Sequence, residues 1–194
     1  TADDMATLAM ILRTNGLPRL KALDLFGNSL GDAGVQALCI GLSCGAVPSL
    51  LRFELPGNQI GPVGAEALAA ALGMGAMPKL KRLDLSGNPI GNQGVAALAA
   101  PLRKLPALKT LILHDCEIGD EGVASLFANL GKDDFKKLGQ LWLQSNKIGD
   151  AGMTTLVAAL DAGGLPALLC NECFLSGNPA SAGRQAVKDA LARR

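Results

Sequence analysis

The sequence predicts an α/β solenoid, in which short parallel strands alternate with helices along one continuous core. Three observations lead to this fold class. A leucine pattern recurs about every 30 residues along almost the whole chain. Within each copy, the apolar spacing changes from every second residue to every third or fourth, which is the change from strand to helix. Aromatic residues make up only 3% of the chain, so the core must be built from many small aliphatic side chains.

Six copies of the repeat follow one another. They begin at Leu20, Leu50, Leu80, Leu108, Leu138 and Cys170. In the third copy, LKRLDLSGNPIGNQGVAAL, Leu83 and Leu85 alternate as in a strand with one buried face, and Val95, Leu98 and Leu102 then share one face of a helix. Neither element can bury its apolar face alone, so the units must stack.

The whole chain, 1–194, is predicted to form a single domain of about six repeats. Residues 1–19 are the helical half of a partial N-terminal repeat, because their leucines match the helix positions of later copies. Residues 20–167 hold five regular repeats. Residues 168–194 hold a degenerate repeat and a C-terminal capping helix, whose polar outer face suits the end of a solenoid.

The ninth position of each copy is polar in a column of otherwise apolar residues. It is occupied by Asn28, Asn58, Asn88, Cys116, Asn146 and Asn178. An amide side chain both donates and accepts hydrogen bonds, so it can satisfy backbone groups that lose their strand partners where the chain turns. We assign this column to a structural ladder and not to catalysis.

With the pattern L-x-x-L-x-L-x-x-N/C-x-L in its copies, the chain resembles the leucine-rich-repeat family. The long period and trailing segments such as GDAGVQAL are similar to the ribonuclease-inhibitor-like subfamily. The resemblance implies a curved horseshoe segment with parallel strands on the concave face and helices on the convex face. It does not identify a partner, because this fold serves many unrelated functions.

Strand residues that point away from the core line the predicted concave face. Ile112, Trp142 and Phe174 occupy equivalent positions on successive strands, which lie about 4.8 Å apart. Contiguous exposed apolar side chains, and Trp above all, are typical of protein contacts. The predicted partner site consists of Ile112, Trp142, Phe174, His114, Gln144 and Gln140. The alternative is that the C-terminal units cover these side chains internally.

The acidic residues of the concave face, Asp24, Glu54 and Asp84, stand beside Arg52 and Arg82, so we expect a self-neutralised surface. Other charges are sorted to two rims, although the net charge is only +1. The acidic rim, after the strands, holds Asp32, Asp115, Glu117, Asp120, Glu121 and Asp150. The basic rim, before the strands, holds Arg19, Lys21, Arg52, Lys79, Lys81, Arg82, Arg103, Lys104, Lys109, Lys132, Lys136 and Lys137.

The basic rim is a candidate contact for an acidic partner or an anionic membrane surface, with ordinary solubility as the alternative. Nucleic acid is not an expected partner, because the rim lacks interleaved aromatic residues for base stacking. No integral membrane segment is expected, because no apolar run approaches the length of a membrane span. Five cysteines at mostly interior positions favour a reducing intracellular compartment, the cytoplasm or, after N-terminal processing, an organelle.

Two motifs suggest chemistry until they are placed on the repeat. His114 and Cys116 are separated by one residue, but the pattern points His114 outward and Cys116 inward. Cys170 and Cys173 fill two inward leucine positions, and no second cysteine or histidine pair completes a zinc set. The sequence therefore predicts no enzyme, no metal site and no cofactor.

The predicted function is protein–protein interaction through the concave face. A structural or accessory subunit of a larger assembly is the alternative. It would dock through its rims and through the open edge of the first strand, since no strand precedes Leu20 to protect that edge. Regulation of a small GTPase is a minor alternative, which the ribonuclease-inhibitor-like resemblance implies.

Overall fold

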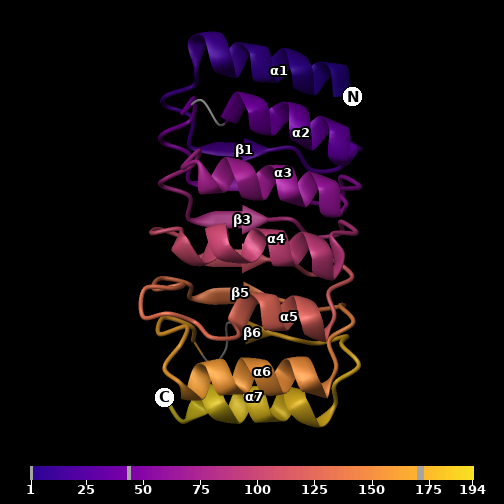
Figure 1. Ribbon diagram of the computed structural model, residues 1–194, viewed down its shortest axis with the longest axis vertical. Helices are drawn as coiled ribbons and strands as arrows, with labels where there is room; N and C mark the ends of the chain where they lie inside the picture. Colours follow the sequence, from indigo (N-terminus) through magenta and orange to yellow (C-terminus); the bar gives the residue numbers. More distant parts are fainter. Residues whose placement is uncertain (1, 43–44, 170–172) are drawn as a thin grey trace.

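The computed structural model describes residues 2–42, 45–169 and 173–194, and it confirms the predicted α/β solenoid (Figure 1). Cys170 lies outside the described residues. One parallel sheet runs through the described part of the molecule in the order β1-β2-β3-β4-β5-β6. The elements are α1 (Ala2–Asn15), β1 (Ala22–Asp24), α2 (Gly31–Leu42), β2 (Arg52–Glu54), α3 (Pro62–Gly73), β3 (Arg82–Asp84), α4 (Gly91–Lys104), β4 (Thr110–Ile112), α5 (Asp120–Phe127), β5 (Gln140–Trp142), α6 (Asp150–Asp161), β6 (Cys173–Phe174) and α7 (Ala182–Ala192).

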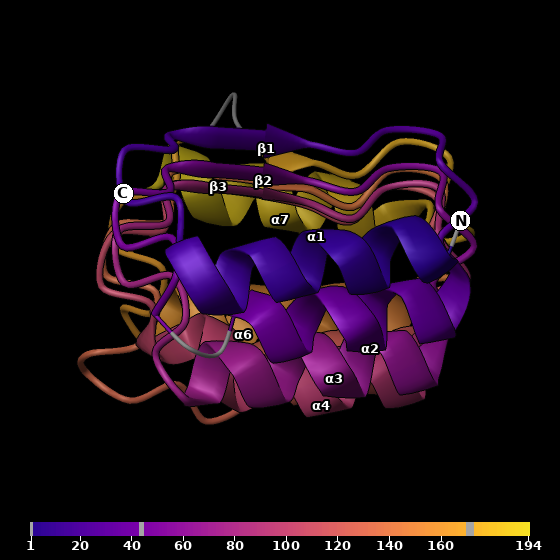
Figure 2. The same cartoon turned by 90° about the horizontal axis from the view of Figure 1, so that it is seen from above.

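Strands and helices form two layers (Figure 2). The helices lie on one side of the sheet, and the other side, which we call the open sheet face, is covered by no helix of the described ranges. Neighbouring strands pair in parallel with equivalent residues in register, so that Leu83 lies opposite Phe53 on one side and Leu111 on the other. Equivalent positions of successive repeats therefore stack into columns across the sheet.

The core fills the space between the two layers. Leu85 from the strand side and Val95 and Leu98 from the helix side are fully buried. Burial of each such leucine stabilises the fold by roughly 1.5–3 kcal/mol. Leu23 and Leu25 of the first repeat are only partly buried, because β1 has a strand neighbour on one side alone.

Helix starts are capped by the preceding repeat. Oδ1 of Asp32 accepts hydrogen bonds from the backbone N–H groups of Gly61 and Gly64, at 2.7 and 2.8 Å. Asp120 caps α6 in the same way, with the N–H of Gly152 at 2.9 Å. A Cβ at Gly152 would lie 2.6 Å from Oδ1 of Asp120, so only glycine permits this approach. Asp32 and Asp120 thus tie their own repeats to the ones that follow.

Candidate partner-binding surface

Two aromatic side chains meet on the open sheet face. Trp142 at the end of β5 is in register with Phe174 at the end of β6. Their ring centroids are 4.6 Å apart and the ring planes are inclined by 48°. Contacts of this kind contribute about 0.5–1.5 kcal/mol beyond area burial. Both residues are half-buried, so these two rings, which we call the aromatic pair, hold each other in place and still present apolar surface.

Ile112 differs from the expectation of a third exposed member of this patch. It is in register with Trp142, but only 2% of its surface is exposed. Strands lie about 4.8 Å apart, so the large Trp142 side chain on one side and Asp84 on the other leave little space above the shorter residue. Ile112 therefore lies beside Trp142 in the sheet and offers almost no surface to a partner.

The polar residues expected around the pair, Gln140, His114 and Gln144, are all half-buried. Gln140 accepts a hydrogen bond from the hydroxyl of Thr110 at 2.8 Å. Within the described residues, the buried Nε1 of Trp142 and the buried Oε1 of Gln144 have no hydrogen-bond partner. A buried polar group without a partner costs about 1–3 kcal/mol. If a bound protein supplied a hydrogen-bond acceptor to Nε1 of Trp142 and a donor to Oε1 of Gln144, part of that cost would be recovered.

Two of the three acidic residues of the open sheet face, Glu54 and Asp84, are neutralised by Arg82, as the sequence indicated. Nε of Arg82 lies 3.0 Å from Oε1 of Glu54, and its Nη2 lies 3.5 Å from Oδ2 of Asp84. Asp84 also accepts hydrogen bonds from the backbone N–H and the hydroxyl of Ser86, at 3.0 and 2.6 Å. Arg52 is exposed and makes no ion pair within the described residues. Glu54 and Asp84 are thus paired internally, whereas Asp24 is exposed and accepts a hydrogen bond from the backbone N–H of Phe26.

The acidic rim also turns out to be largely engaged inside the solenoid. Asp32 and Asp120 cap helices of the following repeat, and Asp150 accepts a hydrogen bond from the backbone at the start of α7 at 3.0 Å. Glu117 forms an ion pair with Lys147 at 2.8 Å. Sequence reasoning missed the capping role. The signal was there as an Asp or Asn placed one residue after the first glycine of a Gly-x-x-Gly helix start.

The ladder asparagines bridge neighbouring repeats. Oδ1 of Asn88 accepts hydrogen bonds from the N–H groups of Asn58 and Ile60, at 2.8 and 3.0 Å. Its amide group donates to the carbonyl oxygens of Leu55 and Leu85, at 2.9 and 2.8 Å. Asn58, Asn146 and Asn178 make corresponding contacts. Asn28 differs because it is exposed and its amide donates only to carbonyls of its own turn.

Cys116 interrupts the ladder. Its thiol donates to the carbonyl oxygens of Leu85 and His114, at 3.3 and 3.4 Å, and it offers no amide oxygen. The N–H of Ile90 bonds instead to the carbonyl of Asn88, at 2.7 Å. Burial raises the pKa of Cys116 to about 12, so the thiol stays protonated at neutral pH. His114 and Cys116 therefore do not form a nucleophilic pair, because a buried protonated thiol is inert.

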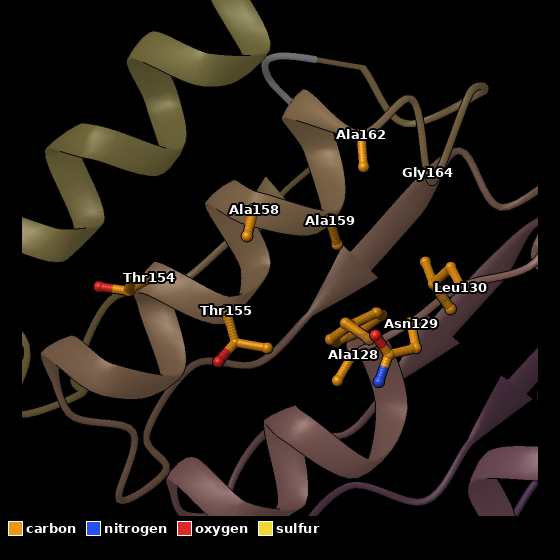
Figure 3. A pocket seen from close by; sticks show the side chains of 10 residues that line it. Ala128, Asn129, Leu130, Thr154, Thr155, Ala158, Ala159, Ala162 and Gly164 are labelled. Atoms are coloured by element: carbon orange, nitrogen blue, oxygen red, sulfur yellow. The ribbon is translucent and has the colours of Figure 1, made fainter.

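A groove of about 410 Å³ opens on the helix side between α5 and α6 (Figure 3). It exists because α5 has 8 residues where α6 has 12. Figure 3 shows Ala158 and Ala159 of α6, with Ala162 just after its end, on one side and Leu130 on the other. Its lining carries no charged side chain. The groove is therefore uncharged, with Asn129, Thr154 and Thr155 among its otherwise apolar lining residues, and the structure gives no indication of what would cover it.

No helix in the described ranges has the length and apolarity that a membrane crossing needs. No group of three or more His, Cys, Asp or Glu side chains in these ranges is placed to hold a metal ion.

Comparison with known proteins identifies the repeat. Residues 17–39, 48–69, 76–99, 104–127 and 137–157, more than half of the chain, match the family model described as Leucine Rich repeat. Among solved structures, the tropomodulin C-terminal domain of Caenorhabditis elegans aligns with a TM-score of 0.59 at 14% identity, over 98% of this chain and 92% of that chain. The BIR2 ectodomain of Arabidopsis thaliana aligns with a TM-score of 0.38 at 17% identity, over 73% and 61% respectively. The comparison with curated proteins found no match.

Proposed function

The chain belongs to the leucine-rich repeat family, and we propose that it binds a protein partner through its open sheet face, with the aromatic pair at the centre of the contact. The observation that carries the proposal is the position of Trp142 and Phe174. The packing of a solenoid does not require two large rings on the side away from the helices. Trp is enriched in binding hot spots, where a few residues supply most of the affinity.

The repeat itself supports a finer assignment within this proposal. Most repeats carry a full helix of 12 or 14 residues, as α3, α4 and α6 do. This length supports a place in the ribonuclease-inhibitor-like subfamily.

The proposal is tested by capture from native extract with the wild-type chain and the variant Trp142→Ala. Loss of a hot-spot Trp costs about 2 kcal/mol or more, which weakens binding roughly 30-fold. Phe26→Ala is the matched control, because Phe26 is an aromatic residue, 71% exposed, at the opposite end of the sheet. A partner that Trp142→Ala captures as well as the wild type would refute the proposal and favour docking through the rims or the edge of β1.

The chain provides its own probe for the purified complex. Trp142 is the only tryptophan, so its fluorescence reports on the aromatic pair alone. Titration with the captured partner should shift the emission to shorter wavelength as the indole loses contact with water. An unchanged spectrum at saturation would place the contact elsewhere on the solenoid.

A further inference from the structure

The two charged rims differ in how much of their charge is used internally. The acidic rim is largely engaged in helix caps and ion pairs, as described above. On the basic rim, Lys104 pairs with Asp134 at 2.6 Å and Lys136 pairs with Asp133 at 2.5 Å. Lys109 and Lys137 have no ion pair within the described residues, although both are exposed. Together with the exposed Lys132, these are the lysines in the C-terminal half of the rim that have no ion pair within the described residues.

Both lysines line one hollow of about 490 Å³ at the start of β4 and β5. We call it the basic hollow; its lining is Lys109, Thr110, Lys136, Lys137, Gly139, Gln140, Ala167 and Leu169. Gly139 adds no side chain to it, and a Cβ there would lie 3.3 Å from the carbonyl oxygen of Ala167. Leu169 is 62% exposed beside the lysines. The hollow thus combines the two unpaired ammonium groups of Lys109 and Lys137 with an apolar wall, and Lys136 lines it with its ion pair to Asp133 in place.

The basic hollow and the aromatic pair lie close together along β5. Gln140 belongs to the lining of the hollow, and Trp142 follows two residues later on the same strand. Residues two apart on a strand share one face and lie about 6.6 Å apart. In an extended peptide, side chains on one face also recur every second residue, about 6.6 Å apart. Two side chains separated by a single residue can therefore span the distance from Gln140 to Trp142.

We propose that the partner is an acidic peptide segment, which places a carboxylate in the basic hollow and an apolar side chain two residues away on the aromatic pair. The proposal rests on the proposed function, since it assigns the chemistry of the partner of the same surface. Carboxylates are attracted by the unpaired Lys109 and Lys137, and Leu169 in the hollow and Trp142 further along β5 offer apolar contact. A hollow beside a sheet favours an extended chain over a flat anionic membrane.

The test selects peptides from a display library of short random sequences on the full chain. The wild type should enrich sequences in which Asp or Glu stands two positions from a large apolar residue. The double variant Lys109→Gln, Lys137→Gln should keep the apolar preference and lose the acidic one. Lys21→Gln with Lys79→Gln is the matched control, because both lysines are exposed on the same rim and outside the basic hollow.

A peptide from the selection is then synthesised with its acidic residue intact and with the matching amide. Loss of two exposed charge contacts should raise the Kd about tenfold, for the amide peptide and for the Lys109→Gln, Lys137→Gln variant alike. Equal binding of the two peptides, no acidic enrichment, or no selected peptide at all would overturn the proposal. An equal effect of the control variant would also overturn it, because that indicates a diffuse field and not a site.

Vesicles of phosphatidylcholine and phosphatidylserine in equal parts provide the membrane arm. Binding of vesicles that Lys109→Gln, Lys137→Gln abolishes, without peptide selection, would replace the peptide by a lipid surface and overturn the proposal. The Trp142→Ala capture separates this inference from the proposed function. If that variant loses the native partner while the lysine variant retains it, the open sheet face binds a partner without the basic hollow.

Discussion

Asn88→Ala tests how much of the stability of the solenoid depends on the ladder. Asn88 is 1% exposed, and truncation removes the acceptor of two buried N–H groups, those of Asn58 and Ile60. Each buried donor left without a partner costs about 1–3 kcal/mol. The carbonyls of Leu55 and Leu85 lose a donor as well. We expect the free energy of unfolding to fall by about 4 kcal/mol, a large part of the 5–15 kcal/mol typical of a domain.

Urea unfolding followed by circular dichroism measures this loss, and Asn28→Ala is the matched control. Asn28 is exposed, and it accepts no hydrogen bond through its side chain within the described residues. Its loss should cost about 1 kcal/mol or less. Asn88→Asp places a buried carboxylate against the carbonyl oxygens of Leu55 and Leu85, so at neutral pH it should destabilise the fold at least as much as Asn88→Ala. Equal losses for Asn88→Ala and Asn28→Ala would refute the assignment of the ladder.

Three further changes test other parts of the structure. Cys116→Asn should restore the interrupted ladder and raise the free energy of unfolding by about 1 kcal/mol in urea; a loss would contradict it. Gly41→Ala should lower the free energy of unfolding by about 2 kcal/mol and expose α1 to limited proteolysis, because a Cβ at Gly41 would lie 2.7 Å from Cα of Ala9 on α1. Gly73→Ala is the control, because Gly73 has open space around it and the substitution should be neutral or stabilising. Burial acts to raise the pKa of Asp134, but the hydrogen bond from Lys104 holds it below its usual value. A carboxyl whose pKa is lowered by folding stabilises the fold above about pH 4, and this contribution is lost as the pH falls through the pKa of the folded state. Asp134→Asn should therefore destabilise the protein at pH 7 and change its stability little near pH 2.

The repeat made the inward positions predictable, because strand alternation and helical spacing state which side of an element each residue faces. Leu85 and Val95 are buried where the pattern placed them. The height of a side chain above the sheet is not part of that pattern. Ile112 faces the predicted side but is covered, since the bulk of Trp142 on the next strand decides what remains exposed.

Interactions between repeats were harder to predict than those within one. The carboxylate of Asp32 reaches the backbone of Gly64, one repeat further along the chain, and a single copy of the pattern contains only half of that contact. The positions of the acidic residues in the repeat therefore predicted an acidic rim, although several of these carboxylates cap the helices of the following repeat. Charge counted along the sequence does not distinguish an internal partner from an external one.

The sequence by itself determined the solenoid, the order of its strands and the column that each residue joins, because a fixed period aligns equivalent positions whatever the loops do. Only the tertiary structure decided how the loop after α5 lies. Phe135 of that loop is buried with its ring centroid 5.9 Å from that of Phe127, and its N–H bonds to the carbonyl of Arg103. This anchorage accompanies the early end of α5, and the lysines that follow it, Lys136 and Lys137, line one hollow with Lys109. Lys109 and Lys137 are 28 residues apart in sequence, and only the packing of one repeat against the next brings them to the same hollow.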